Sequence, residues 1–318
     1  MIKRLLLGLV ALLVAAPALA QSYPTKPIRL VVGYSPGGGN DLIARIVATR
    51  LQEKLGQPVV VDNKPGAASI LAAELVAKAP PDGYTLLMAP SGPLTINPAV
   101  YSKLPYDPVK DFAPISLLAE FPLMLVVGAD QPIRSVKELV DYGKANPDKA
   151  NYASSATPFQ LASELFNQRT GSRFQHIPYR GSGDMAQAVA SGQVLMAIAD
   201  TGPIAGMING GKLRALAIST SKRSPAFKDV PTMIEAGLSG LDVTLWTGVV
   251  APAGTPAAVI ARLNEAIRDV LALPAVEQAF ANLAVDPVGT SPDEYRALIA
   301  RDSARWKEVA ATANIKVE

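Results

Sequence analysis

The chain has 318 residues, with 30 lysines and arginines against 27 acidic residues, one histidine and no cysteine. The absence of cysteine excludes disulfides, thiolate metal sites and cysteine nucleophiles, and a zinc site that included His176 would need carboxylates as all its other ligands. The near-balance of charge gives no sign of a nucleic-acid surface. We therefore expect no metal, no other cofactor and no nucleic-acid partner, and the length favours two lobes over a single core.

Residues 1–20 have the pattern of a secretory signal peptide. Lys3 and Arg4 precede the apolar run LLLGLVALLVAA, and Ala18-Leu19-Ala20 fits the small-x-small cleavage pattern. The apolar run is short, no second stretch of spanning length follows it, and no cysteine follows it that could carry a lipid. The sequence predicts cleavage before Gln21 and export of a soluble mature protein to the periplasm.

The mature chain begins with a strand, a glycine loop and a helix. Residues 28–32 (IRLVV) form a short apolar run typical of a buried strand, and the glycines and Pro36 of residues 33–39 end it. Asn40 or Asp41 then supplies a side-chain oxygen at the start of a helix. The N–H groups of a helix start favour a bound anion, and glycines let that anion approach the backbone.

This glycine loop admits several interpretations. A dinucleotide fingerprint would need glycine at position 42, where Leu42 stands, and a P-loop lysine is missing. Residues 33–37 (GYSPG) match the nucleophile elbow G-x-S-x-G, which would make Ser35 the nucleophile of an exported serine hydrolase. Pro36 argues against this role, because the oxyanion hole uses the N–H of the residue after the serine and proline has none. A plain tight turn and a loop that captures a carboxylate both stay open.

The rest of the chain alternates strand-like and helix-like segments, which predicts βαβ units and mainly parallel sheets. The expected strands are residues 59–61, 84–89, 112–118, 123–127, 150–153, 174–177, 194–199, 213–218 and 241–250, with a loop at 90–93. The expected helices are residues 69–79, 136–145, 158–168, 184–190, 257–273, 274–283 and 292–312. The last of these starts with Ser291-Pro292, a capping hydroxyl before a proline at the first helical position.

Two α/β lobes account for this order. Residues 21–120 with 247–318 form the first predicted lobe, and residues 121–246 form the second. The chain crosses between them near Phe121-Pro122-Leu123 and near Leu245-Trp246, which predicts a two-crossing hinge. The loops at the strand ends would then face each other across a cleft, a default position for a ligand.

Two loops of the second predicted lobe repeat the plan of the glycine loop. Residues 151–160 (NYASSATPFQ) read as a strand, a small-residue loop and a helix start, with Thr157 and Gln160 at capping-box spacing. Residues 179–184 (YRGSGD) follow the next strand, and Arg180 there is either a planar donor for a carboxylate or a solvated loop residue. Three donor-rich loops in two lobes predict an anion clamp.

The sequence resembles the periplasmic solute-binding receptors of tripartite tricarboxylate transporters, known as Bug proteins. The resemblance spans essentially the whole mature chain. It rests on YPTKPIRLVV followed by the PGG loop and Asp41, and on VDNKPGA, PPDGYTLL, INPAVYSKLPYDPVKDFAPI, HIPYRG, GKLRALAIST, DVPTMIEAG and WTGVVAPAGTP. It implies a two-lobed periplasmic-binding-protein fold, type II-like, with two α/β domains that close around a small carboxylate.

The resemblance also implies the ligand-binding positions and the partners. The expected site comprises Tyr34, Ser35, Gly37, Gly38, Gly39, Asn40, Asp41, Ser91, Gly92, Ser154, Ser155, Thr157, Pro158, Tyr179, Arg180, Gly181 and Asp200, with no catalytic residue. We expect a monomeric receptor, not an enzyme, that delivers its ligand to integral-membrane transporter subunits. The other functions considered are the exported hydrolase and a receptor that signals to a sensor kinase. A dicarboxylate, an amino acid and an aromatic acid all stay open as ligands.

Overall fold

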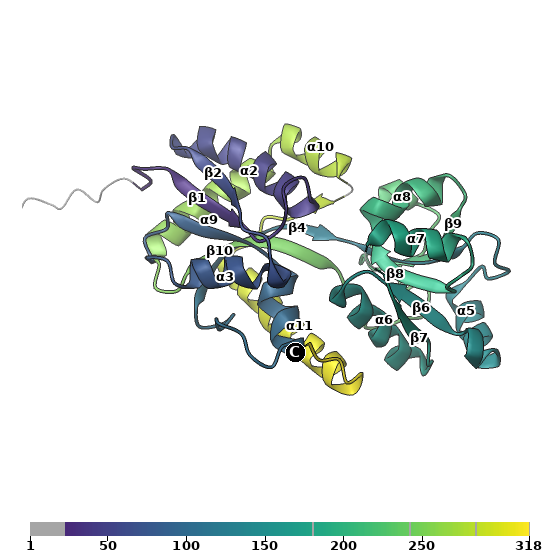
Figure 1. Cartoon of the computed structure of the whole chain (residues 1–318). Helices are drawn as coiled ribbons and strands as arrows, with labels where there is room; N and C mark the ends of the chain where they lie inside the picture. Colours follow the sequence, from purple (N-terminus) through teal and green to yellow (C-terminus); the bar gives the residue numbers. More distant parts are fainter. Residues whose placement is uncertain (1–22, 180, 242, 284, 318) are drawn as a thin grey trace, which may run out of the picture.

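A computed structural model describes residues 23–179, 181–241, 243–283 and 285–317. The predicted signal peptide, residues 1–20, and Arg180 lie outside these ranges. Within them, the chain forms two mixed sheets, each with helices on both faces, and the two α/β units lie side by side (Figure 1). None of the helices in these ranges is both long enough and apolar enough to span a membrane.

The first sheet contains the strand that precedes the glycine loop. In spatial order its strands are β11 (Asp286–Pro287), β4 (Phe112–Phe121), β10 (Leu245–Pro252), β3 (Thr85–Pro90), β1 (Ile28–Val32) and β2 (Val59–Asn63). β1 pairs in parallel with β2 and β3, whereas β10 is antiparallel to both β3 and β4. The glycine loop therefore follows a strand that is buried between two others.

Both faces of this sheet are buried, which explains the continuous apolar run of β1. Leu30 and Val32 pack in one cluster with α2 (Gly39–Leu55), α9 (Ala257–Leu271) and α10 (Pro274–Asn282). Val31, whose side chain points to the opposite face, packs in another with α3 (Ile70–Ala77) and α11 (Pro292–Thr312). The expected buried strand at residues 28–32 is confirmed.

The second sheet is built in a similar way. Its strand order is β7 (Gln175–Pro178), β6 (Asn151–Ser154), β8 (Met196–Asp200), β5 (Leu123–Gly128) and β9 (Leu213–Ile218). The helices α5 (Val136–Ala145) and α6 (Thr157–Thr170) cover one face, and α7 (Ser182–Ala190) and α8 (Thr201–Asn209) cover the other. β6 is parallel to β7 and β8, whereas β5 is antiparallel to β8 and β9.

The expectation of mainly parallel sheets is wrong for the strands that enter from the crossings. β5 follows β4 after Pro122, and β10 brings the chain back to the first sheet. Strands such as β1 and β8 end at the space between the two sheets, so a strand that starts there must run in the opposite direction. The antiparallel pairs of β5 and of β10 are thus a consequence of the two crossings, whereas β11 is antiparallel to β4 without following a crossing.

Two further expectations from the sequence are wrong, and one helix was not expected at all. Helix α8 was not expected, because Gly202 and Gly206 interrupt its apolar pattern and glycine weakens a helix prediction. The expected loop at residues 90–93 is largely replaced: Pro90 ends β3, and Gly92 and Pro93 belong to a single π-helical turn, η2 (Gly92–Ile96), which continues into α4 (Asn97–Val100). β10 begins at Leu245, so the preceding residues of the expected strand 241–250 are not part of it.

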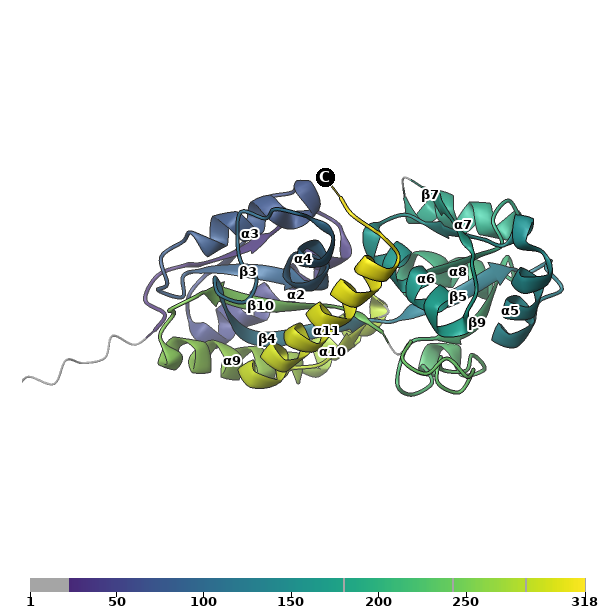
Figure 2. The same cartoon turned by 90° about the horizontal axis from the view of Figure 1, so that it is seen from below.

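Helix α11 contacts both α/β units, which the sequence did not predict. It lies along the first unit, and its C-terminal end reaches α6 of the second (Figure 2). Trp306, Val309 and Ala310 share an apolar cluster with residues of α6, and Gln168 Nε2 donates to the carbonyl of Val309 at 3.4 Å. The lobe boundaries at residues 121 and 246 stay a prediction, and α11 adds a non-covalent connection between the units.

The start of α11 supports a prediction about stability. Ser291 and Glu294 form the full capping box, with Ser291 N donating to Glu294 Oε2 at 2.8 Å and Glu294 N donating to Ser291 Oγ at 3.3 Å. Ser291→Ala removes an N-cap acceptor, so we expect a loss of about 1 kcal/mol in the free energy of unfolding, measured in urea. Ser291→Asp keeps an acceptor and should stay within about 0.5 kcal/mol of the parent. Equal stability of the two variants would contradict this role.

Candidate functional site

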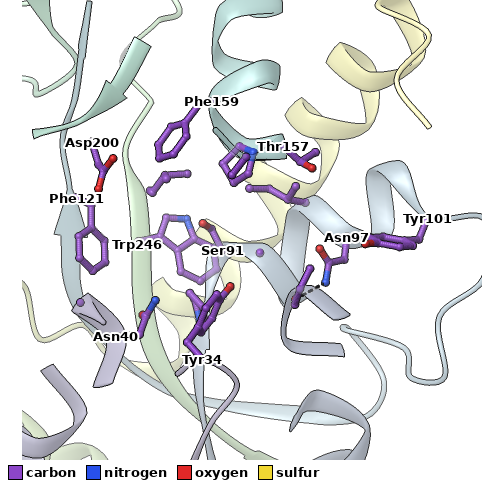
Figure 3. A pocket seen from close by; sticks show the side chains of 18 residues that line it. Tyr34, Asn40, Ser91, Asn97, Tyr101, Phe121, Thr157, Phe159, Asp200 and Trp246 are labelled. Atoms are coloured by element: carbon purple, nitrogen blue, oxygen red, sulfur yellow. Dashed lines mark hydrogen bonds between the residues drawn. The ribbon is translucent and has the colours of Figure 1, made fainter. Parts of the chain in front are cut away.

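A cavity of about 480 Å³ lies between the two sheets and is lined by residues from both (Figure 3). Its walls come from the loops at strand ends, from helix starts and from the two crossings. The lining residues are Tyr34, Gly39, Asn40, Ala68, Pro90, Ser91, Gly92, Ile96, Asn97, Tyr101, Phe121, Ala156, Thr157, Pro158, Phe159, Asp200, Leu245 and Trp246.

The starts of three helices meet at this cavity. Gly39 and Asn40 are the first residues of α2, Thr157 and Pro158 are the first residues of α6, and Asp200 is the N-cap of α8. A helix carries roughly half a positive charge at its N-terminus, on N–H groups without intrahelical partners. The cavity is therefore electropositive at its backbone, with contributions from both units.

The helix caps differ from the expected ones in a way that matters for binding. The N-cap of α2 is Gly38 and that of α6 is Ala156, and neither helix has a side-chain cap hydrogen bond in the described structure. The expected cap at Asn40 or Asp41 and the expected capping box of Thr157 and Gln160 are thus wrong. Glycine and alanine have no side-chain oxygen, so neither cap residue can accept from the first N–H groups through its side chain. In α6 this concerns the N–H of Thr157, because Pro158 has none and Phe159 N donates to the carbonyl of Ala156 at 3.1 Å.

Asp41, a buried side chain in the first turn of α2, holds the glycine loop in place. It is 1% exposed, and its carboxylate accepts hydrogen bonds from Gly37 N at 2.8 Å, Arg45 Nε at 2.9 Å and Asn63 Nδ2 at 2.9 Å. Burial raises the pKa of Asp41, but the bonds from Arg45, Gly37 and Asn63 outweigh it, so the pKa lies below its ordinary value. Gly37 has a φ of 83°, which favours glycine. The ionised carboxylate therefore orders the loop.

Replacing Asp41 tests this account of the loop. Asp41→Asn cannot accept all three bonds, so we expect it to lower the free energy of unfolding by about 2–3 kcal/mol at pH 7. The folded pKa is below the unfolded value of about 3.9, so this contribution is present above pH 4 and declines as the pH falls through the folded pKa. Urea unfolding at pH 7 and pH 3 measures it. Asp148→Asn, at an exposed position, is the control; a loss that does not shrink at pH 3 would refute the assignment.

Neutral polar groups and apolar rings complete the cavity. Burial raises the pKa of Tyr34 to about 12, so its hydroxyl is protonated and available as a donor at neutral pH. Ser91 is buried directly after β3, and Thr157 lines the cavity from the second unit. Trp246 is 1% exposed, and its Nε1 donates to Asp302 Oδ2 at 2.7 Å, so its ring forms an apolar wall (Figure 3). Such a lining suits a small ligand with few polar groups.

Asp200 is the one acidic or basic side chain among the described lining residues. It stands at the C-terminal end of β8. Its Oδ1 atom is buried and has no hydrogen-bond partner among the described residues, and the removal of its carboxyl from water raises its pKa. No lysine or arginine of the described chain lines the cavity, so an anion there would be held by dipoles rather than by a side-chain cation.

The structure places about half of the expected site residues in the cavity wall. Those in the lining are Tyr34, Gly39, Asn40, Ser91, Gly92, Thr157, Pro158 and Asp200. Those outside it are Ser35, Gly37, Gly38, Asp41, Ser154, Ser155, Tyr179 and Gly181, and Arg180 lies outside the described ranges. Ala68, Asn97, Tyr101 and Phe159 line the cavity without having been expected there. Phe121 and Trp246 were expected at the crossings, and their position at strand ends was the available signal.

His176 is placed away from Ser35. Its Nε2 lies 2.7 Å from Ser154 Oγ, and its ring stacks on Tyr152 at 5.2 Å between centroids. Burial lowers its pKa, so the neutral ring is favoured. The histidine thus belongs to the packing of β6 and β7. Among the described residues, no group of three or more histidines and acids is arranged to hold a metal ion.

Comparison with known proteins gives a consistent result along the whole chain. The family described as tripartite tricarboxylate transporter family receptor matches residues 43–315. Protein BugT of Bordetella pertussis is 38% identical over 308 residues, which cover 96% of this chain and 94% of that protein. The structure of Rpa4515 from R. palustris with adipate is 35% identical, covers 92% of this chain and 99% of its own, and superposes with a TM-score of 0.79. MatC from Rhodopseudomonas palustris with bound malate is 32% identical, with coverage of 90% and 99% and a TM-score of 0.75.

Proposed function

The chain belongs to the tripartite tricarboxylate transporter receptor family, whose members are solute receptors and not enzymes, and we propose that it binds a small organic carboxylate between its two sheets. The single observation that supports this most strongly is the pair of helix starts at the cavity. Gly39 and Asn40 of α2 and Thr157 of α6 line one space from opposite units, and neither helix has a side-chain cap among the described residues. In α6 the N–H in question is that of Thr157, because Pro158 has no N–H and Phe159 N donates to the carbonyl of Ala156 at 3.1 Å. A carboxylate at either start would accept from its free N–H groups and complement the helix dipole.

The side chains in the lining support a ligand that is held by neutral donors. The hydroxyls of Tyr34, Ser91 and Thr157 offer hydrogen bonds at neutral pH, and the rings of Phe121 and Trp246 enclose the carbon skeleton. We assign the carboxylate to the end of the cavity at Thr157, the start of α6. The related structures with adipate and malate hold ligands of this chemical class.

The two crossings suit a receptor that opens and closes. Phe121 and Trp246 both line the cavity and stand in paired strands, β4 and β10, that leave and re-enter the first sheet. Rotation about these strands would close the walls around the ligand and expel water. We propose that the closed form, in the periplasm, passes the ligand to integral-membrane transporter subunits, and that the receptor acts as a monomer.

Calorimetric titration tests the binding function. The mature chain, residues 21–318, would be unfolded and refolded to remove any bound ligand and then titrated with succinate, malate, adipate, glutamate and benzoate. We expect at least one of them to bind with a dissociation constant in the micromolar range or below, which corresponds to about −8 kcal/mol or better. No heat of binding from any of these acids would contradict the proposal.

A further inference from the structure

The position of Asp200 restricts which carboxylate the cavity accepts. Asp200 is acidic, yet it lies in a cavity whose backbone is electropositive and which we propose to be an anion site. Its Oδ1 atom is buried and has no hydrogen-bond partner among the described residues, and no described lysine or arginine lines the cavity beside it. A buried acceptor without a partner costs free energy, so a ligand that supplies the missing donor would bind more tightly than one that does not.

The residues around Asp200 indicate which end of a bound ligand would carry that donor. Gly39, Phe121 and Asp200 together line both the main cavity and a smaller one of about 270 Å³, so these three residues meet at one end of the main cavity. Figure 3 shows Asp200 and Phe121 on the side opposite Thr157 and Tyr101. A ligand whose carboxylate lies near Thr157 therefore extends its far end past the phenyl ring toward Asp200.

The charge of Asp200 disfavours one kind of group at the far end of the ligand. A second ionised carboxylate would stand next to Asp200 with no described lysine or arginine in the lining to separate the two charges. An ammonium or a hydroxyl would instead donate to Oδ1, and an ammonium would also balance the charge of the buried carboxyl. The chemistry of the lining thus favours a donor over an acceptor at this end.

We infer that the ligand is a carboxylate that carries a hydrogen-bond donor at its opposite end, and that Asp200 is the residue that selects for this donor. The inference rests on the proposed function, since it takes the carboxylate to lie at Thr157, the start of α6. It distinguishes donor-bearing acids from plain monocarboxylates and from dicarboxylates. Asp200 is then a specificity residue, and the helix starts supply the affinity that all carboxylates share.

A matched set of acids tests the inference. Butanoate, 4-hydroxybutanoate, 4-aminobutanoate and succinate share a four-carbon chain, and pentanoate, 5-hydroxypentanoate, 5-aminopentanoate and glutarate form the five-carbon set. Dissociation constants would be measured for the parent, for Asp200→Asn, and for Asp148→Asn, an exposed aspartate on the one-turn helix η3 (Pro147–Lys149). The asparagine variant keeps the shape of Asp200 and removes its charge.

In the parent, we expect a donor-bearing acid of one length to bind at least about tenfold more tightly than its plain and dicarboxylic partners, as expected for a hydrogen bond to a charged group. Asp200→Asn should remove most of the preference for the amino acid of the set and reduce the preference for the hydroxy acid by less. The dissociation constant of the plain acid should stay within about threefold of its value in the parent. Asp148→Asn should change none of these dissociation constants. A preference that survives in Asp200→Asn, or a plain acid or dicarboxylate that binds as tightly as the donor-bearing acids, would overturn the inference and leave the proposed function standing. Absence of binding by all eight acids would overturn the inference, and it would overturn the proposed function as well if the five acids of the first titration also failed to bind.

Discussion

Thr157→Asp is expected to weaken carboxylate binding by about two to three orders of magnitude while the protein stays folded. Thr157 is the first residue of α6 and lines the cavity. A carboxylate placed there would stand about 4 Å from a bound anion, and two like charges at that distance repel by about 4 kcal/mol at an effective dielectric constant of 20. The same substitution favours the helix, because an acid in the first turn complements the helix dipole.

The controls separate the local effect from a change in net charge. Ser224→Asp adds the same charge at the N-cap of η4 (Pro225–Phe227), outside the cavity, and should leave the dissociation constant unchanged. Thr157→Ser keeps the hydroxyl and should bind within about threefold of the parent. Calorimetric titration and thermal unfolding measure both quantities. Undiminished binding by Thr157→Asp would place the carboxylate elsewhere.

Trp246→Ala is expected to cause the largest loss of stability, about 3–5 kcal/mol in the free energy of unfolding. The side chain is 1% exposed, packs edge-on against Tyr295 at 5.4 Å between centroids, and donates from Nε1 to Asp302. Its removal would leave a cavity between β10 and α11 and an unpartnered Asp302 oxygen. Urea unfolding measures the loss, and the same variant should bind carboxylates less tightly because Trp246 also lines the cavity.

A double-mutant cycle isolates the hydrogen bond within this effect. Trp246→Phe keeps most of the apolar volume and removes the indole donor, which leaves an oxygen of the buried Asp302 without that partner, a cost of about 1–3 kcal/mol. Combined with Asp302→Ala, it should show a coupling of about 1–2 kcal/mol. Additive effects of the two substitutions would show that the bond does not contribute to stability.

The sheet cores were predictable from the sequence because their pattern is local. Leu30, Val31 and Val32 are all apolar, which indicates a strand with both faces buried, and the two faces are covered by different helices. The direction of β5 and β10 was not predictable from the same pattern. It depends on the chain crossing between sheets, and an apolar run has the same composition in a parallel and an antiparallel pair.

The cavity residues in loops that directly follow strands were predictable, whereas those that reach the cavity through packing were not. The loops around Tyr34, Ser91 and Thr157 follow strands and carry glycine, proline or hydroxyl residues, which mark a strand end. Ala68 and Phe159 line the cavity for other reasons. Ala68 lies in a segment, Ala67 to Ser69, whose residues all have positive φ although none of them is glycine, so the sequence does not indicate this conformation. Phe159 has the composition of an ordinary apolar helix residue.

The helix caps show how a wrong prediction bears on function. Asn40, Asp41 and Thr157 are residue types that cap helices, and the sequence favoured them as caps. In the structure the caps are Gly38 and Ala156, and Asp41 instead supports the loop through Gly37. At both helix starts the tertiary structure overrides the local capping preference, and both helix starts border the cavity. Departures from local sequence preference are expected at a binding site, where a ligand supplies the missing interaction.

The most direct test of the central claim is a crystal structure of the mature protein with the carboxylate that binds most tightly. We expect the ligand in the cavity between the sheets, with carboxylate oxygens within about 3 Å of backbone N–H groups at the start of α2 or α6, the distance of an N–H···O hydrogen bond. A carboxylate bound outside this cavity, or held within it without either helix start, would contradict the account.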